Sequence, residues 1–221
     1  MFKTETHLHV SEVSRCGKLT AEEMVKSYYE AGFKTLFISD HLSNTTFSHM
    51  SDATWREKMD FFVTGYEKAK KVGEKYGMNI ILSAEISHDK SGNHYLVYGI
   101  DMEYLYGLED AFEGDVEDVY EYTKNSGAFF VQAHPLRDGK CTPTPMSVDA
   151  FELHNSNPRH QNFDEDLLEI VKKYDLPVTA GSDAHRPEDV AMTGVETENE
   201  IKTAADYIAA VKEGNLKIIY R

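Results

Sequence analysis

Short apolar runs alternate with amphipathic segments along the chain, and this alternation constrains the fold more than any other feature of the sequence. Two Thr-x-x-Glu capping boxes, Thr20 to Glu23 and Thr54 to Glu57, mark helix starts. The second of these helices is predicted to run to about residue 76, before Gly77. Further helices are predicted over residues 116–125, 164–174 and 201–212, and strands over 35–39, 79–86, 94–100, 128–133, 150–153, 177–180 and 216–220.

Alternation of strands with helices is typical of an α/β protein with a mainly parallel sheet covered by helices. About seven such units fit into the chain, which favours a small (β/α) barrel over an open sheet. The length of 221 residues suits a single domain over residues 1–221.

Composition narrows the classes of partner and compartment. The 23 basic and 38 acidic side chains give a net charge of −15, which repels long nucleic acids but leaves small anionic substrates open if bound cations add local positive charge. The start of the chain lacks the apolar run of a signal peptide, and no segment is apolar enough for a membrane span. Cys16 and Cys141 do not make a disulfide framework. We expect a soluble, reduced, cytoplasmic protein.

Histidines and carboxylates follow the predicted apolar runs. In a parallel barrel the carboxyl ends of all strands meet on one face, so these side chains should gather in one pocket. In His7-Leu8-His9 the period-two alternation of a strand points both imidazoles to the same side. The residues at these strand ends are His7, His9, Asp40, His41, Glu85, His134, Asp183 and His185.

Imidazole and carboxylate groups together suit Zn²⁺, Mn²⁺ or Fe²⁺. A bridging carboxylate such as Glu85 would hold two cations roughly 3.5–4 Å apart, the spacing of two-metal hydrolases. The placement of these residues therefore predicts a metal centre.

The motifs resemble those of the PHP family, the polymerase and histidinol phosphatase phosphoesterases. The likeness runs in order from His7 to His185, and residues 183–190 are similar to the histidinol phosphatase branch. His94 resembles the family's histidine-led strand, and His134-Pro135 its later histidine. The four motifs that carry the resemblance are His7-Leu8-His9, Ser39-Asp40-His41, Ala84-Glu85-Ile86 and Gly181-Ser182-Asp183-Ala184-His185.

The resemblance implies a distorted (β/α)₇ TIM-like barrel with two or three divalent metal ions. It implies one cation held by His7, His9, Glu85 and Asp183, a second by Glu85, His94 and His134, and a third by His41 and His185.

The chain departs from the family pattern at Cys16. Many relatives carry an Asp-Gly pair where this chain has Cys16-Gly17. Cys16 is a candidate thiolate ligand that would favour zinc, and Glu12 is a second candidate from the same loop. The alternative reading of Cys16 is a small buried thiol.

The expected reaction is hydrolysis of a small phosphorylated substrate. A water bridging two cations has its pKa lowered toward about 7, so a metal-bound hydroxide is the expected nucleophile. Asp40 is expected to orient a ligand imidazole. Arg186 is placed to grip a phosphate bidentately, with Arg159, His160 and Arg15 as weaker candidates.

Three alternatives stay open. The substrate is histidinol phosphate, or another phosphomonoester or diester, or the chain is a non-catalytic metal-binding module of the same fold. A nuclease is disfavoured by the net charge of −15.

Overall fold

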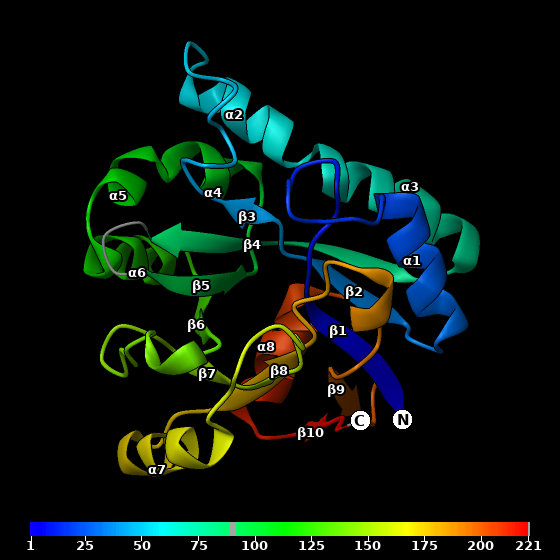
Figure 1. Cartoon of the computed structure of the whole chain (residues 1–221), viewed down its shortest axis with the longest axis vertical. Helices are drawn as coiled ribbons and strands as arrows, with labels where there is room; N and C mark the ends of the chain where they lie inside the picture. Colours follow the sequence, from blue (N-terminus) through cyan, green and yellow to red (C-terminus); the bar gives the residue numbers. More distant parts are fainter. Residues whose placement is uncertain (89–91, 221) are drawn as a thin grey trace.

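The computed structural model describes residues 1–88 and 92–220, with the side chain of His88 left aside (Figure 1). Its strands are β1 (Phe2–Leu8), β2 (Thr35–Ile38), β3 (His41–Leu42), β4 (Asn79–His88), β5 (Asn93–Tyr98), β6 (Phe129–Ala133), β7 (Ala150–Asn155), β8 (Val178–Gly181), β9 (Val195–Thr197) and β10 (Lys217–Ile218). Its α-helices are α1 (Ala21–Glu30), α2 (Trp55–Phe62), α3 (Thr64–Tyr76), α4 (Met102–Gly107), α5 (Glu109–Glu113), α6 (Val116–Asn125), α7 (Asp164–Tyr174) and α8 (Ala204–Lys212).

The strands form one sheet that curls into a nearly closed barrel. Its order is β10-β9-β1-β2-β4-β5-β6-β7-β8, and β3 pairs with β4. The barrel closes where β1 meets the end of β8, through a parallel bridge between Leu8 and Ala184. There His9 N donates to Ala184 O at 3.0 Å and Ala184 N donates to His7 O at 3.3 Å. The predicted α/β barrel is confirmed.

Between β1 and β8, one strand of the sheet runs backward. β5 is antiparallel to both of its neighbours, β4 and β6, whereas β1, β2, β4, β6, β7 and β8 are parallel along the sheet. His94, near the start of β5, pairs with Ser87 on β4 and Ala133 on β6. The reversal therefore brings the beginning of β5 to the rim where the other barrel strands end.

The two predicted capping boxes begin α1 and α2, with Thr20 and Thr54 as N-caps. The helix predicted to reach residue 76 is divided at Val63 into α2 and α3, and Gly77 ends α3 in the left-handed conformation. Helices α4 and α5 and strand β9 lie outside the predicted elements. The helix predicted from residue 201 begins at Ala204, and the last strand is only Lys217–Ile218.

Helices α1 to α3 and α4 to α6 cover the outer face of the sheet (Figure 1). Inside, aromatic side chains pack against α8, since the Tyr207 ring lies 4.8 Å from the rings of both Phe37 and Tyr98. This packing fills the interior near the ends where β6 begins and β5 finishes. The opposite rim carries the candidate site. In the described parts of the chain, no helix is both long and apolar enough to cross a bilayer.

Candidate metal centre

Eight of the nine predicted metal ligands converge at the rim of the barrel, around Glu85 on β4. One oxygen of this buried carboxylate, Oε1, lies 2.9 Å from His94 Nδ1 and 3.0 Å from His134 Nε2. The other, Oε2, lies 2.6 Å from His41 Nδ1 and 3.4 Å from His9 Nε2. Glu85 therefore lies between imidazoles from β3, from β5 and from the segments after β1 and β6.

Asp183 brings in the remaining side chains of this group. Its Oδ1 lies 3.2 Å from His9 Nε2, 3.5 Å from His7 Nε2 and 3.4 Å from His185 Nδ1. Asp183 follows β8, and its backbone is in the left-handed region with φ 49°. The contact between β1 and the end of β8 thus brings Asp183 next to His7 and His9.

Several of the converging atoms are buried but have no hydrogen-bond partner among the described residues. They are His7 Nε2, His9 Nε2, His41 Nδ1, Glu85 Oε2, His134 Nδ1 and Asp183 Oδ1. Buried polar atoms in proteins are normally paired, so a cluster of unpartnered nitrogen and oxygen atoms is unusual. Nitrogen and carboxylate donors are the ligands that Zn²⁺, Mn²⁺ and Fe²⁺ take, so these residues fit a divalent cation.

Three overlapping triads have ligand atoms within 4.8 Å of one another: His7, His9 and Glu85; His9, His41 and His185; and His41, Glu85 and His94. The triads share members, so the candidate ligands form one connected cluster.

Burial and neighbouring charges set the protonation of the cluster. Burial, with repulsion from His41 and His185, holds the pKa of His9 well below its usual range, and burial lowers the pKa of His134 to about 4. These two imidazoles are therefore neutral, the form that binds metals. Burial would raise the pKa of Glu85, but the surrounding histidines hold it well below its usual range. Burial would lower the pKa of His41, but Glu85 raises it to about 10.

Cys16, the ninth predicted ligand, lies beside His41 and His185 in the same cavity. Burial would raise the pKa of its thiol, but hydrogen bonds with those two histidines lower it to about 6. Glu12, the other candidate of this loop, instead accepts from Ala21 N at 2.9 Å, at the start of α1. Of the two candidates, Cys16 is the one at the site.

Asp40 is buried and does not line the cavity. Its Oδ1 accepts hydrogen bonds from Val10 N at 2.9 Å and from Ser14 Oγ at 2.7 Å. Ser14 Oγ in turn lies 3.4 Å from His9 Nδ1 and accepts from His41 N at 3.0 Å. Asp40 thus acts on His9 through Ser14, in a positioning role rather than by contact with a substrate.

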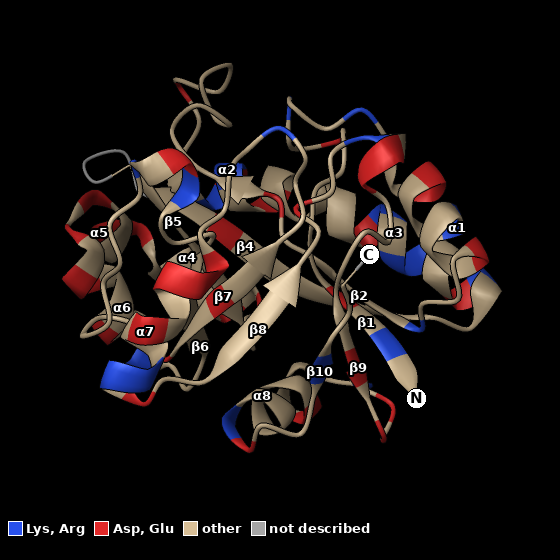
Figure 2. Ribbon diagram, turned by 60° about the horizontal axis from the view of Figure 1, so that its bottom comes forward, with Lys and Arg blue, Asp and Glu red and all other residues tan. Residues whose placement is uncertain are grey.

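The cavity at this site has a volume of about 220 Å³, and its outer wall is rich in cationic side chains. Figure 2 shows Lys and Arg positions in blue on loops beyond the arrowheads of β7 and β8. Arg186 lines the cavity, and its nearest acidic partner is Glu188 at 3.9 Å. Arg159 also lines it, but both guanidinium nitrogens are bound to Asp189, at 2.8 and 2.7 Å.

Several residues of the site were not predicted. Asn157, in the loop after β7, lines the cavity and donates to Asp183 Oδ2 at 3.1 Å. Arg137, in the loop after β6, lines the cavity and bonds to Asp183. Glu152, on β7, is 1% exposed and lies 2.8 Å from His7 Nδ1. Glu152 could have been noticed from the sequence, because it is a carboxylate inside the apolar run 150–153. Arg137 is a single arginine in a loop, and no sequence pattern marks it as a site residue.

Of the remaining candidates, His160 reaches the cavity, whereas Arg15 and His154 do not line it. Arg15 donates a hydrogen bond to Ser48 Oγ at 3.1 Å and does not line the cavity. His154 Nδ1 lies 2.5 Å from Asp164 Oδ2. His160 lines the cavity and lies 2.8 Å from Asp138. The side chain of His88 lies outside the described residues.

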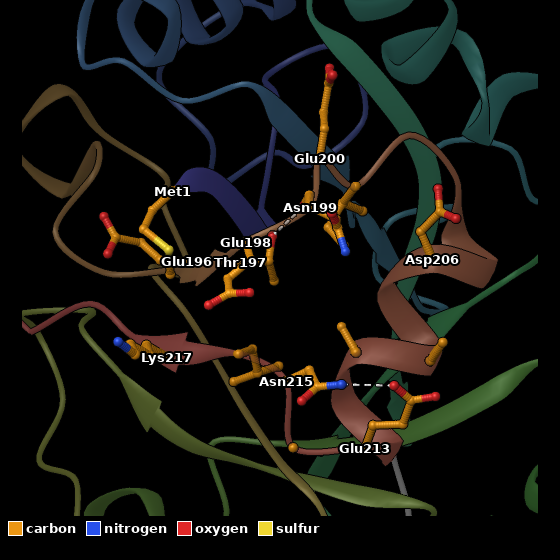
Figure 3. Close-up of a pocket in the computed structure, with 15 residues that line it drawn as sticks. Met1, Glu196, Thr197, Glu198, Asn199, Glu200, Asp206, Glu213, Asn215 and Lys217 are labelled. Atoms are coloured by element: carbon orange, nitrogen blue, oxygen red, sulfur yellow. Dashed lines mark hydrogen bonds between the residues drawn. The ribbon is translucent and has the colours of Figure 1, made fainter.

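A larger cavity, of about 510 Å³, lies elsewhere, between β9, α8 and β10 (Figure 3). Its labelled charged side chains are mostly acidic, with Lys217 as the exception, and Asn215 donates to Glu213 at 2.8 Å. This wall repels phosphate and contains none of the predicted ligands, so size alone does not identify the site. The acidic side chains are Glu196, Glu198, Glu200, Asp206 and Glu213.

Comparisons with known proteins agree with the motifs. The model of the PHP-associated family matches residues 167–216. No curated protein sequence is significantly similar to the chain.

Among solved structures, a two-domain protein from Bacteroides vulgatus, containing a predicted PHP-like metal-dependent phosphoesterase, matches with a TM-score of 0.73 and 14% identity. The match covers 100% of this chain but 65% of that protein, so this chain spans less than two thirds of its length. A protein from Bifidobacterium adolescentis, proposed to be a metal-dependent phosphoesterase, matches with a TM-score of 0.59 and 16% identity over 95% of both chains.

A lesion-specific endonuclease from Pyrococcus furiosus matches with a TM-score of 0.64 and 14% identity, over 98% of this chain and 57% of that one. At these identities the likeness establishes a shared fold. The shared fold and the PHP-associated segment at residues 167–216 agree with the resemblance of the motifs to the PHP family.

Proposed function

We propose that this protein is a metal-dependent phosphoesterase that hydrolyses small phosphorylated molecules. The observation that carries the proposal is the cluster of buried, unpartnered imidazole and carboxylate atoms around Glu85. The cluster and the PHP fold support a metal-dependent hydrolase. The class of ester and the number of cations are part of the proposal.

The cations proposed are two or three of Zn²⁺, Mn²⁺ or Fe²⁺. When bound, they would lower the pKa of water and neutralise charge on the phosphoryl oxygens. The residues that would hold them are His7, His9, Glu85 and Asp183 for one, Glu85, His94 and His134 for a second, and His41, His185 and Cys16 for a third.

The chain's own side chains would bind and orient the substrate. Arg186 lines the cavity, its side chain is 44% exposed, and its ion pair with Glu188 is long at 3.9 Å, so it is suited to hold a phosphate. Asp40 and Ser14 would keep the His9 ring in place. The cavity of about 220 Å³ suits a small substrate, since pockets for drug-sized ligands occupy roughly 300–1,000 Å³.

The test combines elemental analysis of the purified protein with a panel of phosphomonoesters and diesters that includes histidinol phosphate and nucleotides. His9→Ala or Asp183→Ala should abolish turnover and reduce bound metal while the fold is kept, because each removes a ligand. His154→Ala is the matched control, since His154 is paired with Asp164 away from the cluster.

Retained turnover in His9→Ala or Asp183→Ala would rule out the proposed site. Metal content without turnover of any ester would instead identify a binding module. The ratio of monoester to diester hydrolysis decides the substrate class.

A further inference from the structure

Glu152 is a buried carboxylate that contacts two candidate metal ligands from different parts of the barrel. Its Oε1 lies 2.8 Å from His7 Nδ1. Its Oε2 accepts hydrogen bonds from His134 N at 2.9 Å and from Asn155 Nδ2 at 2.8 Å. The side chain is 1% exposed, so these contacts are shielded from bulk solvent.

The first contact fixes which nitrogen of His7 is free for a metal. Carboxylate oxygens accept hydrogen bonds, so the hydrogen between the two groups is assigned to His7 Nδ1. The other ring nitrogen, Nε2, has no hydrogen-bond partner among the described residues and is the one left for a cation. This atom lies 3.5 Å from Glu85 Oε1 and 3.5 Å from Asp183 Oδ1, inside the cluster.

The second contact holds a strained backbone. His134 has φ 33°, in the left-handed region that non-glycine residues rarely adopt. Such a conformation persists only when its surroundings enforce it. The bond from His134 N to Glu152 Oε2 is one such constraint, and it keeps the His134 side chain directed toward Glu85.

The hydrogen bonds continue from Glu152 to a third ligand. Asn155, bound to Glu152, accepts from Asn157 N at 3.1 Å through its Oδ1. Asn157 Nδ2 then donates to Asp183 Oδ2 at 3.1 Å. One chain of buried groups on β7 and the segment after it therefore reaches ligands at the ends of β1, β6 and β8.

We infer that Glu152 is a positioning residue of the metal centre, which selects the metal-binding tautomer of His7 and holds His134 in place. The inference rests on the proposed metal centre, but it makes its own claim about cation affinity. Groups that hydrogen-bond to metal-bound histidines typically change metal affinity about 10- to 100-fold when they are replaced.

The test is the Zn²⁺ affinity of Glu152→Gln, measured by competition with a chromophoric chelator. Three donors contact the Glu152 carboxylate: His7 Nδ1, His134 N and Asn155 Nδ2. A glutamine side chain has one acceptor oxygen and one N–H₂ donor, so it cannot accept from both His7 Nδ1 and His134 N. We expect Zn²⁺ affinity to fall about 10- to 100-fold. The effect should be smaller in a His7→Ala background, because the two residues act through the same contact.

Asp149→Asn is the matched control. Asp149, just before β7, accepts hydrogen bonds from Phe130 N at 2.9 Å and Tyr120 OH at 3.2 Å, away from the cluster. The same carboxylate-to-amide change should there alter Zn²⁺ affinity by no more than about twofold. If Glu152→Gln does not fold, Glu152→Asp keeps the acceptor and serves for the comparison, with reduced affinity expected from its shorter reach.

The outcomes separate the two claims. Wild-type affinity in Glu152→Gln, or in Glu152→Asp where that variant replaces it, overturns the inference even if the wild type hydrolyses esters. Zn²⁺ binding that weakens as expected, with no ester hydrolysed by the wild type, supports the inference and rejects the proposed function. A wild type that binds no Zn²⁺ or other divalent cation overturns both.

Discussion

Two arginines line the same cavity, but their guanidinium groups have different partners. Arg159 makes two short bonds to Asp189, whose side chain is fully buried and also accepts from His185 N and Arg186 N at 2.9 Å. Arg186 makes a longer ion pair, at 3.9 Å, with Glu188, whose side chain is 60% exposed. The first arginine therefore stabilises the loop that carries His185, whereas the second is available to a substrate.

At the residue scale we predict opposite effects for the two arginines. Arg186→Ala should lower kcat/KM about 10- to 100-fold with metal content unchanged, because a hydrogen bond to a charged group contributes about 1.5–3 kcal/mol. Arg159→Ala should lower the free energy of unfolding by about 1–3 kcal/mol, because it leaves the Asp189 carboxylate buried without its partner. Steady-state kinetics and urea unfolding separate the two, and a stability loss in Arg186→Ala alone would contradict the assignment.

At the scale of elements, the caps make helix stability depend on pH. In α2, Glu57 Oε2 accepts from Thr54 N at 2.8 Å, and Glu57 N donates to Thr54 Oγ1 at 3.3 Å. The backbone and hydroxyl bonds from Thr54 hold the pKa of Glu57 below its usual range. A carboxyl with a lowered pKa in the folded state stabilises the fold above its unfolded pKa, and this contribution is lost as the pH falls.

Thr54→Ala should cost about 1 kcal/mol of unfolding free energy at pH 7. Glu57→Gln should destabilise the protein at pH 7 and have less effect at a strongly acidic pH, because protonation of the wild-type carboxyl removes its contribution to stability. Urea unfolding of both variants at the two pH values measures this, and a pH-independent effect of Glu57→Gln would refute the explanation.

The helices and strands also differ in how well they could be predicted from the sequence. The caps at Thr20 and Thr54 and the apolar periodicity located α1, α2, α6 and α7, because these signals are local. The direction of β5 could not be predicted from the sequence, because parallel and antiparallel strands show the same alternation of side chains. Its reversal is set by pairing with β4 and β6, which depends on residues far along the chain.

In the candidate site, too, some residues could be predicted from the sequence and others could not. Imidazoles and carboxylates next to apolar runs were predictable, and the structure brings them together around Glu85. Glu152 was not, because its role comes from His7 and His134 on other strands. The pairing of Arg159 with Asp189 likewise joins two loops whose distance no local pattern gives.

At the scale of the whole molecule, a chain with a net charge of −15 gathers buried carboxylates and histidines at one rim. Bound cations would balance the buried negative charge there and stabilise the native state alone. We expect a chelator to lower Tm, because a ligand at 100 times its Kd adds about 2.7 kcal/mol of stability. Unchanged Tm after verified metal removal would count against a structural contribution of the metal.

Proton release accompanies that binding. In the metal-free state the pKa of His41 is about 10, so its imidazole is protonated at neutral pH and must lose a proton to become a ligand. Metal affinity should therefore increase with pH between 6 and 9, and titration calorimetry in buffers of different ionisation enthalpy should detect the released protons. Affinity that is independent of pH would show that His41 does not bind a cation.

The antiparallel direction of β5 reduces the number of residues needed to build this part of the barrel. Each parallel neighbour in a barrel requires a crossover of about a dozen or more residues, whereas an antiparallel neighbour needs only a hairpin. β4 ends at His88 and its antiparallel neighbour β5 begins at Asn93, so Glu85 and His94 reach the same rim although they are only nine positions apart in the sequence. A protein of modest size can in this way surround one small cavity with donors from nearly every side.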